Sequence, residues 1–286
     1  MSIELSNVLV TQFAEEVKHK FQDESMLRDT VRIKDAKNAK TVKFPVMGKG
    51  LAQERSNFQT PLPVMNVTHS HATATVTNWT ASELTDIFLE NQVNFDEQQE
   101  LVQAISMALG RRLDQIIIDS LVAAGVSNTV TANIGGNNTN MNLAKLQEIA
   151  RLLDANGVPS EMRTLALHPN NLHKMLGENK ITSADYAAIK ALVQGDLGSF
   201  YGFDFKKIAT RDEGGLPMAD SDDRKLYAWH KQAVGLAMNM EPTIRIDYDE
   251  TYGAHRVTGF LAAGATVIDE TGVVEILADD DANPSA

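Results

Sequence analysis

The run Phe44-Pro45-Val46-Met47-Gly48 is a short apolar strand, and it opens the stretch, residues 43–125, that decides the fold. A polar segment with several glycines and prolines follows at residues 48–63 and offers little that a core could bury. Residues 66–77 then alternate as in a β-strand, but neither face of this strand is strongly apolar. Such a strand cannot lie between two packed layers. The stretch therefore predicts a two-stranded arm that projects from the subunit or is covered by another chain.

A long amphipathic helix completes this stretch, at residues 94–125. Asn94 offers an N-cap with Glu97 at the capping-box position, and Gly125 is a natural stop after the last turn. One apolar stripe follows the whole helix at helical spacing: Leu101, Ala104, Ile105, Ala108, Leu109, Leu113, Ile116, Ile117, Leu121 and Ala124. With a rise of about 1.5 Å per residue, the helix is on the order of 45 Å long. This length predicts a stiff spine.

Shorter elements flank the arm and the spine. The expected helices cover residues 2–21, 143–157, 169–176 and 183–193. The expected strands cover residues 30–33, 41–44, 164–167, 203–209, 225–229, 233–238, 243–248, 255–262, 265–268 and 273–277. This order predicts an α+β fold in which residues 130–241 form a compact mixed domain.

The composition of the 286-residue chain excludes several classes of function. The formal net charge of −12 disfavours tight nucleic-acid binding, which needs clustered Lys and Arg. Cysteine is absent, which excludes disulfides, thiolate catalysis and cysteine-based zinc sites. We also expect no secretory signal and no membrane contact, because no basic leader or long apolar run is present.

Motifs that would carry catalysis or bind a metal are incomplete in this chain. His168 and His173 lack the spacing of a zinc-binding helix, and Pro169 interrupts them. His69 and His71 share a strand face at a spacing that can bind metal, but no third ligand is near in sequence. They fit an arm surface better, with a pH-sensitive contact between subunits as a further alternative. No calcium loop, phosphate loop or nucleophile elbow is complete, so we predict no catalytic, cofactor-binding or metal site.

The order of elements resembles a known family, the major capsid proteins of tailed bacteriophages, which have the Hong Kong ninety-seven capsid fold. Residues 41–48 (TVKFPVMG) are similar to the start of the extended loop in podovirus-like coat proteins. Residues 85–121 resemble their short helix followed by the spine helix. Residues 230–237 (HKQAVGLA) resemble the strand near the end of their axial domain. The resemblance covers most of the chain and rests on the order and spacing of these motifs.

The resemblance implies a division of the chain by region. Residues 1–42 would be the N-terminal arm, 43–78 the extended loop, 79–129 with 242–278 the peripheral domain, and 130–241 the axial domain. Residues 279–286 would be a frayed acidic tail. In this fold the extended loop lies over a neighbouring subunit, which would explain a long strand that has no partner layer in its own chain.

The resemblance also implies a function and a set of partners. The chain would self-assemble as hexamers and pentamers into an icosahedral shell around double-stranded DNA, in the host bacterial cytoplasm, and would remain in the virion. Its partners would be copies of itself, a separate scaffolding protein, a portal protein and packaged DNA without specific binding, with a decoration protein left open. A separate scaffold is expected because the first helix begins too near Met1 to leave room for a fused one. Two alternatives stay open: an encapsulin-type nanocompartment shell, and a cytosolic α/β enzyme with its site in residues 130–241.

The side chains expected at subunit contacts lie on the arm and in the middle of the spine helix: Phe44, Lys49, Glu54, Arg55, Phe58, His69, His71, Arg111 and Arg112. For Arg111 and Arg112, ion pairing within the chain and with an adjacent subunit are equally open. Some capsids of this fold carry a Lys–Asn crosslink. Lys49 lies in the corresponding region, but no crosslink is predicted here.

Overall fold

The computed structural model describes residues 25–37, 39–54, 58, 62, 64–86, 97–176, 199–211, 213–220 and 222–282. The helices are α2 (Glu97–Ala124), α3 (Leu143–Ala155) and α4 (Pro169–Leu176), with 3₁₀ turns η2 (Arg28–Thr30) and η3 (Glu270–Gly272). The strands are β1 (Arg32–Asp35), β2 (Thr41–Met47), β3 (His69–Thr75), β4 (Thr77–Asp86), β5 (Thr129–Val130), β6 (Arg163–Leu167), β7 (Ser199–Phe200), β8 (Phe203–Lys207), β9 (Asp223–His230), β10 (Val234–Asp249), β11 (Ala254–Val267) and β12 (Val273–Asp279). None of the helices in this part of the chain combines the length and the apolar character needed to cross a membrane.

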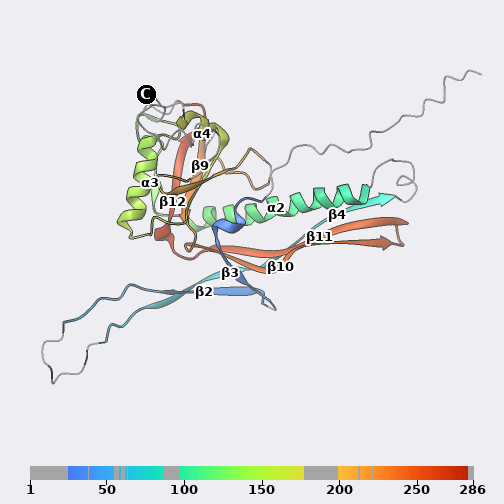
Figure 1. Cartoon of the computed structure of the whole chain (residues 1–286), viewed down its shortest axis with the longest axis horizontal. Coiled ribbons are helices and arrows are strands. Elements are labelled where there is room, and N and C mark those ends of the chain that lie inside the picture. Colours follow the sequence, from blue (N-terminus) through green and yellow to red (C-terminus); the bar gives the residue numbers. More distant parts are fainter. Residues whose placement is uncertain are drawn as a thin grey trace, which may run out of the picture.

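The strands form three sheets, and each belongs to a different part of the molecule (Figure 1). A six-stranded sheet of order β5-β12-β9-β6-β8-β7 packs with α3 and α4 into a compact head. A four-stranded sheet of order β1-β10-β11-β4 extends away from the head alongside α2. The third sheet is the pair β2-β3, which projects on its own in the opposite direction.

The spine helix α2 forms as its apolar stripe predicts and packs on the four-stranded sheet. Five stripe residues are almost fully buried: Ile105, Leu109, Leu113, Ile117 and Leu121. Helix and sheet approach closely at Gly259 of β11, where a Cβ atom would lie 2.4 Å from the Ile105 side chain. Gly125, with φ of +57°, ends the helix in the left-handed conformation that glycine adopts easily. The expected Asn94 cap lies outside the described residues.

Several strands are longer than the sequence predicts. Residues 233–238 and 243–248 belong to one strand, β10, whose register shifts on both sides of Met240 absorb the irregular stretch around Pro242. Residues 255–262 and 265–268 merge into β11, because Gly264 stays inside the strand. A Cβ atom at Gly264 would lie 2.0 Å from the Thr75 carbonyl oxygen, so this glycine allows the arm to cross the sheet.

The short helix expected from Thr85 is wrong for residues 85–86, which end strand β4. β4 pairs with β11 over ten positions, from Thr77↔Ala263 to Asp86↔Ala254, and this ladder satisfies its backbone groups. The helices expected at residues 2–21 and 183–193 lie outside the described residues.

The end of the chain differs from expectation in two ways. β12 joins the head sheet between β5 and β9, although the sequence groups it with the peripheral strands. The start of the tail is not frayed, because Asp280 forms hydrogen bonds with several other residues. Its carboxylate accepts hydrogen bonds from Arg224 Nε at 2.8 Å and Asn171 Nδ2 at 2.9 Å, and its backbone N–H donates to the Asp222 carbonyl at 2.9 Å.

A buried lysine joins β12 to the start of α3. Lys145 is fully buried, and its Nζ donates hydrogen bonds to the carbonyls of Thr139, at 2.6 Å, and Leu277, at 2.9 Å. Burial lowers the pKa of Lys145 to about 8, against the opposite effect of Asp223 and Asp279. The ammonium therefore keeps the end of β12 near α3 at the cost of being partly desolvated.

We expect this lysine to make stability depend on pH. Between pH 8 and the ordinary lysine pKa of 10.5, the unfolded chain binds more protons than the folded chain, so stability rises with pH. The free energy of unfolding of the wild type, relative to Lys145→Met, should increase by about 1 kcal/mol per pH unit across this window. Urea unfolding of the wild type and of Lys145→Met at several pH values measures this difference. A difference that stays constant with pH would contradict this account.

Candidate interaction surface

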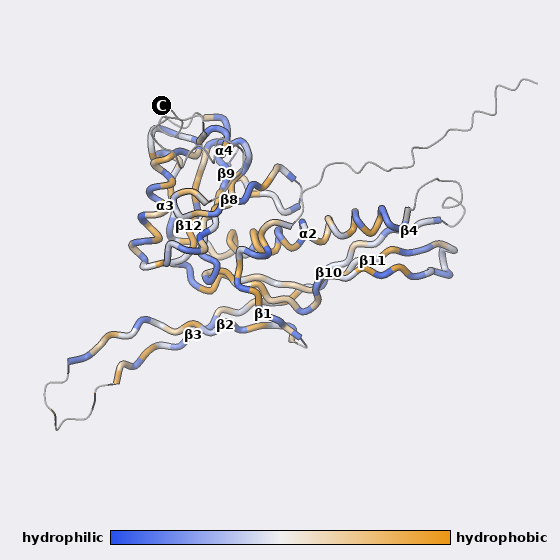
Figure 2. The backbone as a smooth tube through the Cα atoms, in the orientation of Figure 1, coloured by the Kyte–Doolittle hydropathy of each residue, from blue (hydrophilic) through white to orange (hydrophobic). Residues whose placement is uncertain are grey.

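The arm is a two-stranded ladder with an apolar tip. β2 and β3 pair from Thr41↔Thr75 to Met47↔His69, and the Gly48 N–H extends the ladder with a 2.8 Å bond to the Thr68 carbonyl. Large apolar side chains are exposed beyond this ladder and at its end, and we call them the arm-tip set: Met47, Leu51, Phe58, Leu62, Val64 and Met65, which are 51–83% exposed. Figure 2 shows apolar stretches along the exposed length of the arm. Large exposed apolar side chains on a projecting element are typical of an interaction surface.

The base of the arm is anchored by Phe44, which is fully buried. It lies in a small core of its own chain with Val42, Ala74, Val76, Ala237 and Ala262. Gly235 of β10 makes room for the ring, because a Cβ atom there would lie 2.8 Å from Phe44 Cζ. The expectation that Phe44 contacts another subunit is therefore wrong: its side chain has no surface to offer, and it holds the arm to the sheet.

The other arm candidates keep accessible positions. Lys49, Glu54 and Phe58 are exposed, Phe58 at 83%. His69 and His71 are exposed on one face of β3. Arg55 lies outside the described residues. Within the described residues, no group of three or more His, Cys, Asp or Glu side chains is placed to hold a metal ion.

The two spine arginines lie on the helix where Arg211 and residues 213–215 of the head approach it. Arg112 donates from Nη1 to the Glu213 carboxylate at 3.0 Å, and its guanidinium stacks on the Trp79 ring at 3.4 Å. Arg112 therefore pairs within its own chain. Arg111 is partly buried, and Gly214, with φ of +75°, passes so close that a Cβ atom there would lie 2.8 Å from the Arg111 carbonyl oxygen.

A buried carboxylate that the sequence does not single out joins three segments at this point. Asp114 of α2 is fully buried, and its Oδ1 accepts hydrogen bonds from the Ser25 hydroxyl at 2.9 Å and the Leu27 N–H at 3.1 Å. Its Oδ2 accepts from the Met26 N–H at 3.2 Å and from Arg211 Nη2 at 3.3 Å. Burial raises the pKa of Asp114, while these hydrogen bonds and the Arg211 charge act to lower it. The start of the described chain is thus fixed to the middle of the spine.

Comparisons with known proteins agree with this geometry. The model of the family described as phage capsid protein matches residues 5–280. The head structure of Helicobacter pylori bacteriophage KHP40 has a TM-score of 0.76 at 13% identity, over 98% of this chain and 99% of that chain. The capsid of cyanophage P-SCSP1u has a TM-score of 0.75 at 16% identity, over 96% and 94%. A structure from Mycobacterium phage Che8 has a TM-score of 0.69 at 17% identity, over 92% of this chain and 95% of that chain. No curated protein matches the chain.

At these low identities the structural likeness establishes the fold. The expected α+β capsid fold and the expected resemblance are both confirmed.

Proposed function

The chain belongs to the phage capsid protein family, as a major capsid protein, and we propose that its copies form hexamers and pentamers of an icosahedral shell around double-stranded DNA. The family match over residues 5–280 carries this proposal. The role is structural and its place is the virion. No observation favours a nanocompartment shell instead.

The arm supplies the contact between copies in this proposal. Its tip set is exposed in the described chain, and in a shell the next copy would cover it. Burying one large apolar side chain stabilises by about 1.5–3 kcal/mol, so the six residues provide on the order of 10 kcal/mol per arm before ordering costs. Lys49, Glu54, Arg55, His69 and His71 would lie beside this contact.

The proposal also includes partners other than copies of the chain itself. A separate scaffolding protein and a portal protein would act during assembly in the host bacterial cytoplasm, and the DNA would be enclosed without specific binding. The net charge of −12 supports this last point, because an acidic protein does not bind phosphates tightly.

We also propose a revised division into domains. Residues 1–42 form the N-terminal arm and 43–78 the extended loop. Residues 79–128 and 234–272 form the peripheral domain, and residues 129–233 with β12 form the axial domain. The pairing of β12 with β5 and β9 supports moving this strand to the head.

Electron microscopy tests the proposed function. The chain is expressed alone and together with the products of the genes that neighbour its own, among which a scaffolding protein is sought. Polyhedral shells of uniform size are the expected result in at least one of the two conditions. A chain that stays a small globular species in both conditions would overturn the proposal.

A further inference from the structure

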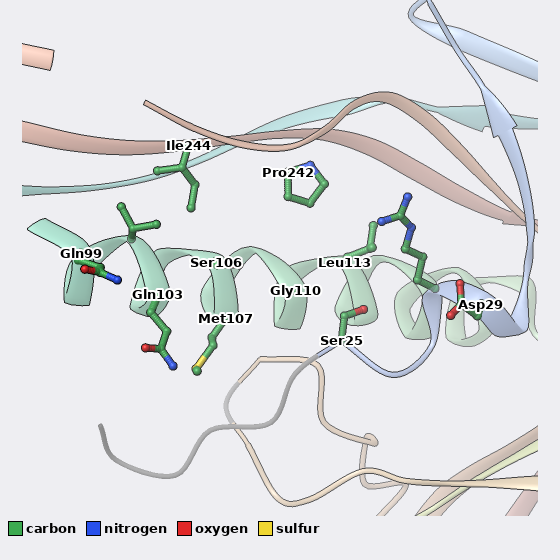
Figure 3. A pocket seen from close by; sticks show the side chains of 12 residues that line it. Ser25, Asp29, Gln99, Gln103, Ser106, Met107, Gly110, Leu113, Pro242 and Ile244 are labelled. Carbon is green, nitrogen blue, oxygen red and sulfur yellow. The ribbon is translucent and has the colours of Figure 1, made fainter. Parts of the chain in front are cut away.

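A groove of about 640 Å³ lies along the spine helix beside β10 (Figure 3). Val102 and Met107 of α2 and Pro242 and Ile244 of β10 give it apolar walls. Two glutamines of α2 line its polar side together with Arg28 and Asp29. β1 pairs with β10 only at residues 235–238. Among the described residues, no strand lies beside the outer edge of β10 farther out, so the groove stays open there.

The chain enters this groove at Ser25, which lies against the helix at Gly110 (Figure 3). A Cβ atom on Gly110 would be 3.3 Å from the Ser25 nitrogen, so glycine permits the close approach. Asp114 then fixes Ser25, Met26 and Leu27 by three hydrogen bonds. The residues that precede Ser25 therefore start from a fixed point at one end of the groove.

The preceding 24 residues lie outside the described part of the chain, but their sequence fits the groove. Six apolar residues recur at helical spacing: Leu5, Val8, Leu9, Phe13, Val17 and Phe21. The groove follows α2 from Gln99 to Leu113, about four helical turns or roughly 21 Å. The C-terminal part of a helix over residues 2–21 would lie along this length, and Val17 and Phe21 of its apolar stripe would face the groove.

We propose that the N-terminal segment of each chain docks its apolar stripe in the groove of that same chain, parallel to α2. In this docked state the helix continues through residues 22–24, so the register that places Ser25 beside Gly110 places Phe21 near Ser106 and Val17 near Val102, because both helices rise equally per residue. The anchor at Asp114 favours the chain's own segment over a second copy, since a short tether gives an effective concentration in the millimolar range. This docking is a property of the subunit and does not require that shells form.

Cysteine crosslinking tests the docking sharply, because the natural chain has no cysteine. The double variant Val17→Cys/Val102→Cys should form a disulfide under mild oxidation and run as an intramolecular, reducible species. The matched control pairs Val17→Cys with Val122→Cys, which lies toward the other end of α2 and is 40% exposed. The control should stay reduced.

Two other results would overturn the proposal. Crosslinked dimers as the main product would show that the segment of a second copy occupies the groove. Absence of crosslinking would show that the segment does not lie there. A second measurement guards against a misfolded double variant: the thiol of Met107→Cys should react several-fold faster when residues 2–22 are deleted. An equal rate with and without the segment would also contradict the docking.

Discussion

Replacing residues 49–67 by an Asn-Gly turn should leave a folded subunit that forms no shells. Gly48 and Thr68 already pair across the arm, so a two-residue turn can close the ladder between them. The shortened chain keeps Phe44 and Ala74, which hold the base of the arm, and loses most of the arm-tip set. We expect the thermal midpoint to stay within about 3 °C of the wild type, because surface changes alter stability little. Circular dichroism measures the midpoint, and electron microscopy counts shells.

A full-length control separates the length of the arm from its apolar character. Changing Leu51, Leu62, Val64 and Met65 together to serine keeps the arm but removes most of its exposed apolar surface. This variant should also fail to form shells if apolar burial holds the copies together. Shells from the shortened chain would place the main contact elsewhere. A shortened chain that no longer folds would mean that the tip belongs to the core.

The arm and the spine could be predicted because their patterns are local. Alternation over residues 66–77 and the 3.6-residue period of the spine can be seen without knowing what packs against them. The same applies to α4, where Pro169 at the first position marks the start of the helix. The sequence patterns do not reveal strands β4, β5 and β7, the sheet that β12 joins, or the merging of neighbouring strands. These features depend on partners in other parts of the chain.

The contacts that fix the arm and the N-terminal segment are long-range and could not be predicted in this way. Asp114 and Ser25 form a hydrogen bond although they are 89 positions apart in the sequence, and no local pattern near either residue indicates this contact. The sequence carries one weak sign of this contact. Asp114 follows Leu113 and lies beside the apolar stripe of the helix, and a carboxylate buried there needs hydrogen-bond donors. Phe44 gives the opposite case. Its place in an arm suggested exposure, whereas the glycine at 235 in a distant strand creates the site that buries it.

The two phenylalanines of the arm should respond to truncation in opposite ways. Phe44→Ala removes a fully buried ring and leaves a cavity between the arm and the sheet. We expect it to lower the free energy of unfolding by about 3–5 kcal/mol. Phe58→Ala shortens a side chain that is 83% exposed and should change this free energy by less than about 0.5 kcal/mol. Urea unfolding of the unassembled subunit measures both.

Shell formation is a second measurement that should distinguish Phe44→Ala from Phe58→Ala. Phe58→Ala keeps a well-anchored arm but weakens its tip, so shells should form more slowly or at higher protein concentration while the subunit stays fully stable. Phe44→Leu should restore most of the stability lost in Phe44→Ala, because an apolar side chain of similar reach refills the cavity. If Phe44→Ala proved as stable as the wild type, the ring would not be the anchor, and it would again be a candidate for contact with the next copy.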